Sequence, residues 1–268
     1  MHRIALIKKV ICNDRINEYE SIIALAKENN YEIISLRRYA QSEYDPSKNV
    51  LVLRHDIDSI NKGTEMMFEI EKKYGVFSSF YFRNSTFTPV LMKEIEKYGS
   101  ESSLHFETIA DYLKANPDIQ TKEMLYKTDF QDRCLKLLKF DIEKFRILLD
   151  IPCLTIASHG DSINRLFDIP SNVLTENSEA YKYLGIQLEA YDSVFLEKAC
   201  YISDCPIDLN YGYRYKTTPV TAIKNKEKLI VFLTHPEHWY LQYFDIIYKT
   251  LKILIKGSTE RIDTFRRI

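Results

Sequence analysis

Residues 51–58, Leu-Val-Leu-Arg-His-Asp-Ile-Asp, join a continuous apolar run to a cluster of ionisable side chains. An apolar run bounded by polar residues is typical of a buried strand in a parallel sheet. Asp56 and Asp58 are two residues apart, so on an extended strand their side chains point to the same face. Two carboxylates on one face repel each other, and a divalent cation bound by one of them would remove the cost of burying them. The alternative for Asp-x-Asp alone is a polar strand end that forms surface salt bridges.

Four of the six histidines stand at or just after the carboxyl ends of predicted strands: His55, His105, His159 and His235. The carboxyl ends of parallel strands meet at one face of a barrel, so four separate segments would bring imidazoles to one pocket. A single histidine in such a position is more often structural than functional. Four of them, together with the two aspartates, indicate a common site.

Imidazole and carboxylate ligands without thiolate favour zinc, iron, cobalt, nickel or manganese over calcium or magnesium. A catalytic metal site normally has three protein ligands and one position open for water. The metal lowers the pKa of that water to about 7 and polarises a carbonyl. A second carboxylate can accept the proton of the water, and a histidine opposite can protonate the leaving amine or alkoxide. The sequence therefore predicts one divalent transition metal, with zinc as the first choice.

The composition excludes several other classes of protein. The chain has 268 residues, and its 37 basic and 38 acidic side chains are spread along the whole length, so we expect no nucleic-acid partner. No apolar stretch approaches the length of a membrane span, and lysines interrupt the apolar residues at the N-terminus, so we expect no signal peptide and a cytoplasmic protein. Five cysteines without a Cys-x-x-Cys pair predict reduced thiols rather than a disulfide framework or a thiolate zinc site.

Segments with helical and strand periodicity alternate through most of the chain, which predicts βαβ units and a parallel sheet. The predicted helices cover residues 17–30, 64–74, 88–98, 121–149 and 240–254, and residues 163–178 are expected to be largely irregular. The predicted strands cover residues 31–36, 51–58, 76–82, 101–106, 153–157, 184–190, 199–203 and 229–234. We expect one domain over residues 1–268, with residues 1–30 as an N-terminal extension and helix and 258–268 as a polar tail. The length favours a barrel or barrel-like closure over an open sheet.

Six short landmarks occur in an order and spacing that resemble the polysaccharide deacetylase family, whose domain is also called the NodB homology domain. The resemblance covers roughly residues 31–239. The landmarks are Leu53-Arg54-His55-Asp56-Ile57-Asp58, residues 76–82, residues 99–107, Ala157-Ser158-His159-Gly160, Tyr201-Ile202-Ser203-Asp204 and Leu233-Thr234-His235-Pro236. The resemblance implies a distorted (β/α) barrel of about seven strands and metal-dependent hydrolysis of N-acetyl or related amide groups.

The same resemblance implies a role for four residues. Asp56 corresponds to the catalytic base of the family, Asp58 to its metal-binding aspartate, and His105 to the first histidine of its H-x-x-x-H metal motif. His235 corresponds to the catalytic acid after the last strand.

The sequence departs from the family pattern at three places. Isoleucine stands at position 109, where the second metal histidine should be. The segment Ser100-Glu101-Ser102-Ser103 stands where the family has flanking glycines, and Ser158-His159-Gly160 replaces an arginine motif. The third metal ligand is then His159 as first choice or Glu107 as second, or metal binding is weakened or lost. His55 is expected to contact substrate or to hold Asp56. Glu107 and Trp239 complete the residues expected to bind substrate.

The expected function is metal-dependent hydrolysis of a non-peptide C–N bond, most simply N-deacetylation of a carbohydrate. The alternative is a catalytically impaired barrel that serves as a carbohydrate-binding or scaffold protein, which the isoleucine at 109 motivates. A glycosidase with paired carboxylates ranks last, because the sequence provides only one carboxylate cluster. In the cytosol the substrate would be a nucleotide-linked or lipid-linked sugar, or a small amide.

Overall fold

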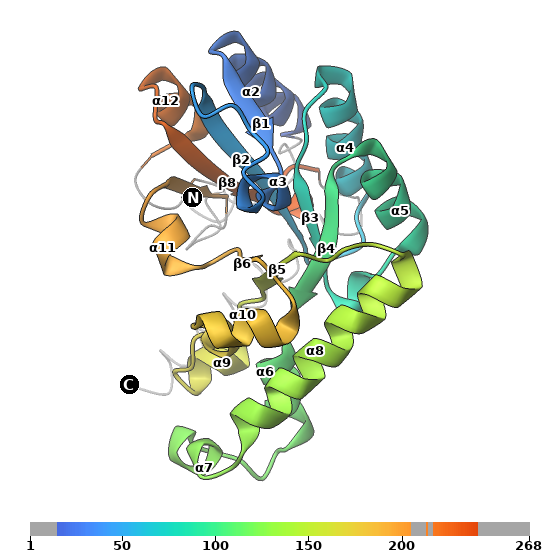
Figure 1. Ribbon diagram of the computed structural model, residues 1–268, viewed down its shortest axis with the longest axis vertical. Coiled ribbons are helices and arrows are strands. Elements are labelled where there is room, and N and C mark those ends of the chain that lie inside the picture. The colour runs from blue at the N-terminus through green and yellow to red at the C-terminus, as the bar shows by residue number, and fades with distance from the viewer. Residues whose placement is uncertain (1–14, 205–212, 214–216, 241–268) are drawn as a thin grey trace, which may run out of the picture.

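A computed structural model describes residues 15–204, 213 and 217–240. This part of the chain contains a sheet of eight parallel strands in the order β6-β5-β4-β3-β2-β8-β7, with β1 paired to β2 beside that path (Figure 1). The strands are β1 (Tyr31–Ile34), β2 (Asn49–Ile57), β3 (Ser79–Phe82), β4 (Glu101–Phe106), β5 (Thr155–Ser158), β6 (Leu188–Glu189), β7 (Cys200–Ser203) and β8 (Leu229–Thr234).

Strand β2 is the centre of the sheet and contains the apolar run that opens the 51–58 segment. On one side, the first half of β2 pairs with β1 and its second half pairs with β3. On the other side, β2 pairs with β8, from Val50 opposite Leu229 to His55 opposite Thr234. Leu51, Val52 and Leu53 are fully buried, as expected for a strand that is covered on both faces.

The sheet curls into a half-barrel. Strands β6 and β7 are its two edges, and among the described residues they do not pair with each other. The prediction of an α/β architecture with a parallel sheet of about seven strands is confirmed, while full closure into a barrel is not seen in this part of the chain. Strand β6 has only two residues, too few for a continuous ladder on both of its sides.

Helices surround the sheet. They are α2 (Ile16–Glu28), α3 (Leu36–Ala40), α4 (Lys62–Tyr74), α5 (Pro89–Tyr98), α6 (Thr108–Ala115), α7 (Lys122–Tyr126), α8 (Phe130–Leu149), α9 (Ser162–Leu166), α10 (Ser178–Leu184), α11 (Ser193–Leu196) and α12 (Pro219–Lys224), with 3₁₀ turns η1 (Asn84–Thr86), η2 (Val173–Thr175) and η3 (Pro236–His238). Helices α4, α5 and α8 lie along one side of Figure 1, and α2 and α12 lie at the top.

The alternation of side chains along β2 separates the outer core from the interior of the curl. Leu51 and Leu53 belong to the outer core under α2, α4 and α12. Val50 and Val52 point the other way and pack with Phe195 of α11 inside the curl. The period of two residues extends to the polar end of the strand, so it decides which ionisable groups face which side.

Several predicted elements differ from the observed ones. The predicted strand 184–190 is mostly the end of α10 and a turn at Gly185, which has a φ of +66°, and only Leu188–Glu189 is extended. Asn177 begins α10 by accepting a hydrogen bond from the N–H of Ala180, a capping signal that the prediction did not use. The predicted helix 121–149 is divided into α7 and α8. Helix α9 overlaps the start of the segment expected to be irregular, and the predicted helix 240–254 and tail 258–268 lie almost wholly outside the described residues.

No helix in the described part of the chain has both the length and the apolar character needed to cross a bilayer. The cysteines in that part, Cys134, Cys153 and Cys200, are free thiols.

A buried polar network joins α4 to the outer face of β2. Glu71 is fully buried and accepts hydrogen bonds from Tyr19 Oη at 2.6 Å, from His55 Nε2 at 2.7 Å and from Ser78 Oγ at 2.6 Å. The other ring nitrogen of His55 pairs with Thr234 Oγ1. Four elements, α2, β2, β8 and the segment before β3, therefore depend on one carboxylate.

We predict that Glu71→Ala lowers the free energy of unfolding by roughly 3–5 kcal/mol, because it leaves three buried donors without an acceptor. Urea denaturation followed by circular dichroism measures this change. Glu69→Ala is the matched control on the same helix: Glu69 is exposed and pairs with Lys72 at the surface, so its loss should cost less than about 0.5 kcal/mol. An equal decrease in the free energy of unfolding for Glu71→Ala and Glu69→Ala would contradict a stabilising role of the buried network.

Candidate metal centre

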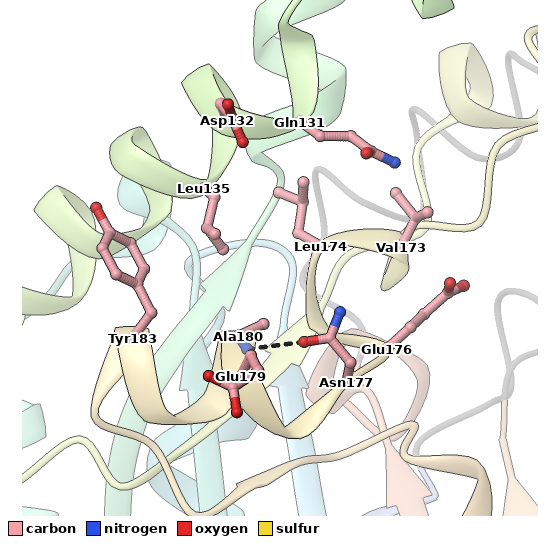
Figure 2. Close-up of a pocket in the computed structure, with 10 residues that line it drawn as sticks. All are labelled: Gln131, Asp132, Leu135, Val173, Leu174, Glu176, Asn177, Glu179, Ala180 and Tyr183. Atoms are coloured by element: carbon pink, nitrogen blue, oxygen red, sulfur yellow. Dashed lines mark hydrogen bonds between the residues drawn. The ribbon is translucent and has the colours of Figure 1, made fainter.

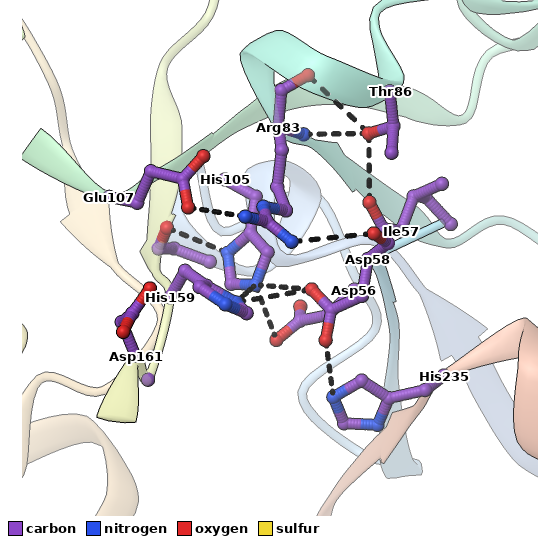
Figure 3. A network of polar contacts seen from close by, with 12 residues as sticks. Asp56, Ile57, Asp58, Arg83, Thr86, His105, Glu107, His159, Asp161 and His235 are labelled. Atoms are coloured by element: carbon purple, nitrogen blue, oxygen red, sulfur yellow. Dashed lines mark hydrogen bonds and ion pairs between the residues drawn. The ribbon is translucent and has the colours of Figure 1, made fainter. Parts of the chain in front are cut away.

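The ionisable groups gather inside the curl at the carboxyl ends of the strands. Asp56 and Asp58 come from the end of β2, His105 from β4, His159 from the residue after β5, and His235 from the residue after β8 (Figure 3). The prediction that distant segments bring carboxylates and imidazoles to one face of the sheet is confirmed for these five side chains. They converge because all the strands are parallel and neighbouring strand ends lie at the same edge.

Three donor atoms form a nearly equilateral triangle. Asp58 Oδ1 lies 3.1 Å from His159 Nδ1 and 3.4 Å from His105 Nε2, and the two ring nitrogens are 3.2 Å apart. Two ligands of a tetrahedral zinc ion with bonds of 2.0–2.1 Å are about 3.3 Å apart. The three atoms thus have the spacing of three tetrahedral ligands, and a fourth position is left for water or substrate.

The orientation of His105 suits a ligand. Its Nδ1–H donates to the carbonyl oxygen of Ala157 at 3.0 Å, in the register where these two residues pair across β4 and β5. This bond directs the lone pair of Nε2 toward Asp58 and His159, the arrangement that metal-bound histidines usually show. The next backbone bond of the same pair of strands, from the N–H of His159 to the carbonyl of Phe106, positions the second imidazole.

Asp58 Oδ1 is a buried carboxylate oxygen that has no hydrogen-bond donor among the described residues apart from the two ring nitrogens that face it. Burial by itself raises the pKa of Asp58, but hydrogen bonds from His105 and His159 and the charges of His105 and His235 hold that pKa well below its usual range. The ionised carboxylate therefore faces two ring nitrogens, which can donate protons to it or, when they carry no proton, can share a metal ion with it. The donor set of one carboxylate and two imidazoles fits a divalent transition metal.

Asp56 is held by an arginine from its own strand. Arg54 Nε and Nη2 donate to the two oxygens of Asp56 at 2.9 and 2.7 Å, and both side chains are almost fully buried. The guanidinium also donates to the carbonyl of Ala190 and stacks over the ring of Tyr191, 4.2 Å from its centre. Burial raises the pKa of Asp56, but the attraction of Arg54 keeps that pKa below its usual value. The second oxygen of Asp56 lies 3.5 Å from His105 Nε2, beside the triangle.

His235 is held in a similar way by Asp204, which follows β7. Its Nδ1 bonds to Asp204 Oδ1 at 2.7 Å, and its backbone N–H donates to Oδ2 at 2.8 Å. Nε2 is thereby directed into the site, 4.0 Å from Asp58 Oδ2. Burial lowers the pKa of His235, but the charge and hydrogen bond of Asp204 raise that pKa well above the usual value, which favours the protonated ring. Sequence reasoning quoted Asp204 without assigning it a role, although its position directly after a strand was a usable signal.

A second group of possible metal ligands contains Asp204, His235 and His238. Its carboxylate is already engaged, because Asp204 accepts from the ring and the backbone of His235 and from Trp239 Nε1 at 2.6 Å. These protein donors fill the positions that a cation would need. We therefore place the candidate metal centre at the triangle of Asp58, His105 and His159.

Two of the residues expected to bind substrate do not reach the site. His55 points to the outer face of β2, because it alternates with Asp56, and its ring nitrogens bond to Glu71 and Thr234. Trp239 is fully buried, with its Nε1 on Asp204. Neither position supports a contact with substrate, nor does His55 hold Asp56, a role taken by Arg54.

Glu107 and Ile109 complete the positions named from the sequence. Glu107 lies near the triangle but forms an ion pair with Arg83. Glu107, His159 and Asp161 form a further group of closely spaced donors, in which Asp161 pairs with Lys114. Ile109 is buried in the core on α6, so the protein offers no ligand at that position.

Glu189, at the end of β6, supports the turn that contains His159. Its two oxygens accept the N–H groups of Ser158 at 2.9 Å and of Tyr191 at 2.7 Å. Burial, only partly opposed by Arg54, raises the pKa of Glu189 to about 7. Sequence reasoning did not single out this residue, because nothing in its local sequence marks a buried carboxylate.

We predict that the raised pKa of Glu189 makes the stability of the protein depend on pH. The folded state holds this proton up to about pH 7, whereas an unfolded glutamate releases it near 4.5, so stability is lost as the pH rises between these values. The wild type should lose about 3 kcal/mol relative to Glu189→Gln between pH 4.5 and 8. Urea denaturation of both proteins at several pH values measures the difference, and parallel pH profiles would contradict the assignment.

Another cavity, of about 500 Å³, lies between α8, η2 and α10 (Figure 2). None of its ten lining residues is a histidine or a cysteine, and the side-chain oxygen of Asn177 is occupied as the cap of α10. It therefore lacks the nitrogen and sulfur donors that a transition-metal site prefers.

No protein-family model matches the chain, and no curated protein is similar to it.

Proposed function

We propose that the protein is a metal-dependent hydrolase of C–N amide bonds and that it removes the acyl group of an N-acylated sugar or sugar intermediate, as the resemblance to polysaccharide deacetylases implies. The observation that carries the proposal is the triangle of Asp58 Oδ1, His105 Nε2 and His159 Nδ1, with sides of 3.1–3.4 Å, which is flanked by a buried carboxylate and an imidazolium. Amide hydrolysis needs these three parts: a Lewis acid, a base and an acid.

The metal would be held by Asp58, His105 and His159, with zinc as the first choice. When bound, such an ion would polarise the amide carbonyl and make a water molecule more acidic. The donor set, the spacing of the three atoms and the buried Asp58 oxygen without another donor support this assignment. His159 provides the third donor that Ile109 cannot, and this favours a catalytic protein over an impaired barrel.

Asp56 is the proposed base. Arg54 keeps its carboxylate ionised and fixes the plane of the carboxylate, because two parallel hydrogen bonds define that plane. Each carboxylate oxygen has a second lone pair, and the oxygen 3.5 Å from His105 Nε2 is on the side of the triangle. Asp56 can therefore accept a proton from water there while the water oxygen forms its bond to the acyl carbon.

His235 is the proposed acid. Its Nδ1–H is engaged by Asp204, so the proton on Nε2 is the one that faces the site. As the C–N bond breaks, this proton passes to the nitrogen of the leaving amine. The products are a carboxylic acid and a free amine, and transfer of a proton from Asp56 to His235 through solvent restores both groups.

We predict that protein purified without chelator contains close to one equivalent of a divalent transition metal, and that Asp58→Ala and His159→Ala each lose it. Mass spectrometry of the metals in the folded protein measures this content. His238→Gln, in the other group of ligands, is the matched control and should keep the metal. Loss of metal in His238→Gln alone would move the centre to Asp204, and a metal-free wild type would reject the proposal.

We predict that His235→Ala lowers kcat by roughly 10²–10⁴-fold and leaves the metal content unchanged, because it removes a proton donor and no ligand. Release of free amine from N-acetylated sugars, tested alone and linked to phosphate, measures the rate. Asp204→Asn should also lower kcat, since the imidazolium loses the carboxylate that stabilises it. A His235→Ala variant as active as the wild type would assign the acid to another group.

A further inference from the structure

A cavity of about 310 Å³ lies beside the candidate metal centre, between the first turns of α4 and α5. It shares a wall with that centre, because Ile57 lines the cavity and the next residue, Asp58, belongs to the triangle. Thr86 and Arg83 hold this turn in place: Thr86 Oγ1 donates to the carbonyl of Ile57 at 2.8 Å, and Arg83 donates to the carbonyl of Asp58 (Figure 3). A molecule in the cavity would therefore contact the strand end whose next residue is a donor of the candidate metal centre.

The first turn of α5 lacks the cap that its sequence could provide. Helices α5 and α12 both begin with Thr-Pro-Val, and Thr218 caps α12 by accepting a hydrogen bond from the N–H of Thr221. Thr88 does not cap α5, because its hydroxyl donates to the carbonyl of Thr86 instead. The N–H groups of the first turn of α5 thus have no side-chain acceptor, and that turn attracts anions.

Thr64 provides an independent sign of a missing ligand. It lines the same cavity from the first turn of α4, is 2% exposed, and its hydroxyl has no hydrogen-bond partner in the described part of the chain. Buried hydroxyls are normally paired, since leaving one unpaired costs roughly 1–3 kcal/mol. An oxygen atom of a ligand would satisfy it.

The rest of the cavity is apolar. Ile57, Phe82 and Leu91 form part of its lining, and the rim contains Ile60. Ile60 is 73% exposed, so a large apolar side chain faces solvent at the rim. Val90, the second residue of α5 and the neighbour of the lining residue Leu91 in sequence, is also 73% exposed. An apolar group of a ligand would cover them.

The charges at the rim nearly cancel. Lys62 and Glu65 both line the cavity from the first turn of α4, and both are exposed to solvent. The attraction for an anion therefore comes mainly from the N–H groups of the helix and the hydroxyl of Thr64, with Lys62 as a further donor.

We propose that this cavity binds a phosphate group that carries an apolar chain. The uncapped first turn of α5 and the buried hydroxyl of Thr64 on α4 provide donors from two sides of the cavity, which suits an oxyanion, and the exposed Ile60 at the rim suits the chain. Resting on the proposed function, the assignment makes the substrate an N-acylated sugar linked through phosphate to an apolar carrier.

Calorimetric titration of the full-length protein with hexyl phosphate, inorganic phosphate and hexanol tests the proposal. We expect one hexyl phosphate to bind at least tenfold more tightly than either of the other probes. Val90→Asp should weaken that binding at least tenfold, because it adds a negative charge at an exposed position where an acidic residue favours the helix. Val220→Asp, at the same position of the capped helix α12, should bind like the wild type. Thr64→Val should weaken binding several-fold.

Three results would overturn the proposal. One is the absence of saturable binding of hexyl phosphate, another is equal affinity for inorganic phosphate, and a third is equal weakening by Val90→Asp and Val220→Asp. Titration of the Asp58→Ala variant with hexyl phosphate tests the cavity site independently of the proposed metal centre. Unchanged binding to this variant would place the phosphate in the cavity, even if the metal centre does not exist. Loss of binding would place the phosphate on the metal and would reject the cavity site.

Discussion

The central constraint on this structure is the placement of three aspartates, two of them buried and one partly buried, at one edge of a parallel sheet. Each of them needs a compensating positive charge or proton donors, since an unpaired buried carboxylate is strongly unfavourable. Asp56 has the guanidinium of Arg54, and Asp204 has the imidazolium of His235. Asp58 instead faces two imidazoles whose ring nitrogens also face each other, and among the described residues no arginine or lysine forms an ion pair with its carboxylate. The position of the proposed metal follows from this difference.

The alternation of β2 keeps the reactive groups apart from the structural ones. Arg54 and Asp56 point into the curl, while His55 points outward to Glu71 on α4. The hydrogen bond from His55 to Glu71 joins β2 to α4, and this contact fixes the position of Arg54 and Asp56 on the inner face. A shift of β2 by one residue would turn Arg54 and Asp56 outward and His55 inward. It would remove both the attachment of β2 to α4 and the carboxylate from the candidate site.

The turn after β2 connects the candidate metal centre to the cavity between α4 and α5. Its backbone carbonyls accept hydrogen bonds from Thr86 and Arg83 in the segment after β3, so the two segments are joined. A shared turn suits recognition, because it would set the separation between a ligand in the cavity and a reacting group at the centre. The proposed phosphate site and the proposed reaction are thus two parts of one surface at the carboxyl ends of the strands.

The sequence by itself determined the alternation of helices and strands, the buried strand at residues 51–57, and the convergence of Asp56, Asp58, His105, His159 and His235 on one edge. These features follow from local patterns and from the geometry that all parallel sheets share. The sequence did not determine the partners of these groups. The contacts of these partners join different strands or cross the buried interior, as those of Arg54, Asp204 and Glu189 do. No local sequence pattern distinguishes a carboxylate that has such a partner from one that has none.

The tertiary structure alone decided which candidate third donor lies within reach of Asp58 and His105, the inaccessibility of His55 and Trp239, and the half-barrel shape among the described residues. The third ligand depended on where the end of β5 lies relative to β4, which the register of His105 with Ala157 sets. The orientation of His55 could have been deduced from the same period of two that placed Asp56 and Asp58 together. The burial of Trp239 could not, because it results from packing between segments far apart in the chain, and periodicity describes only neighbours in sequence.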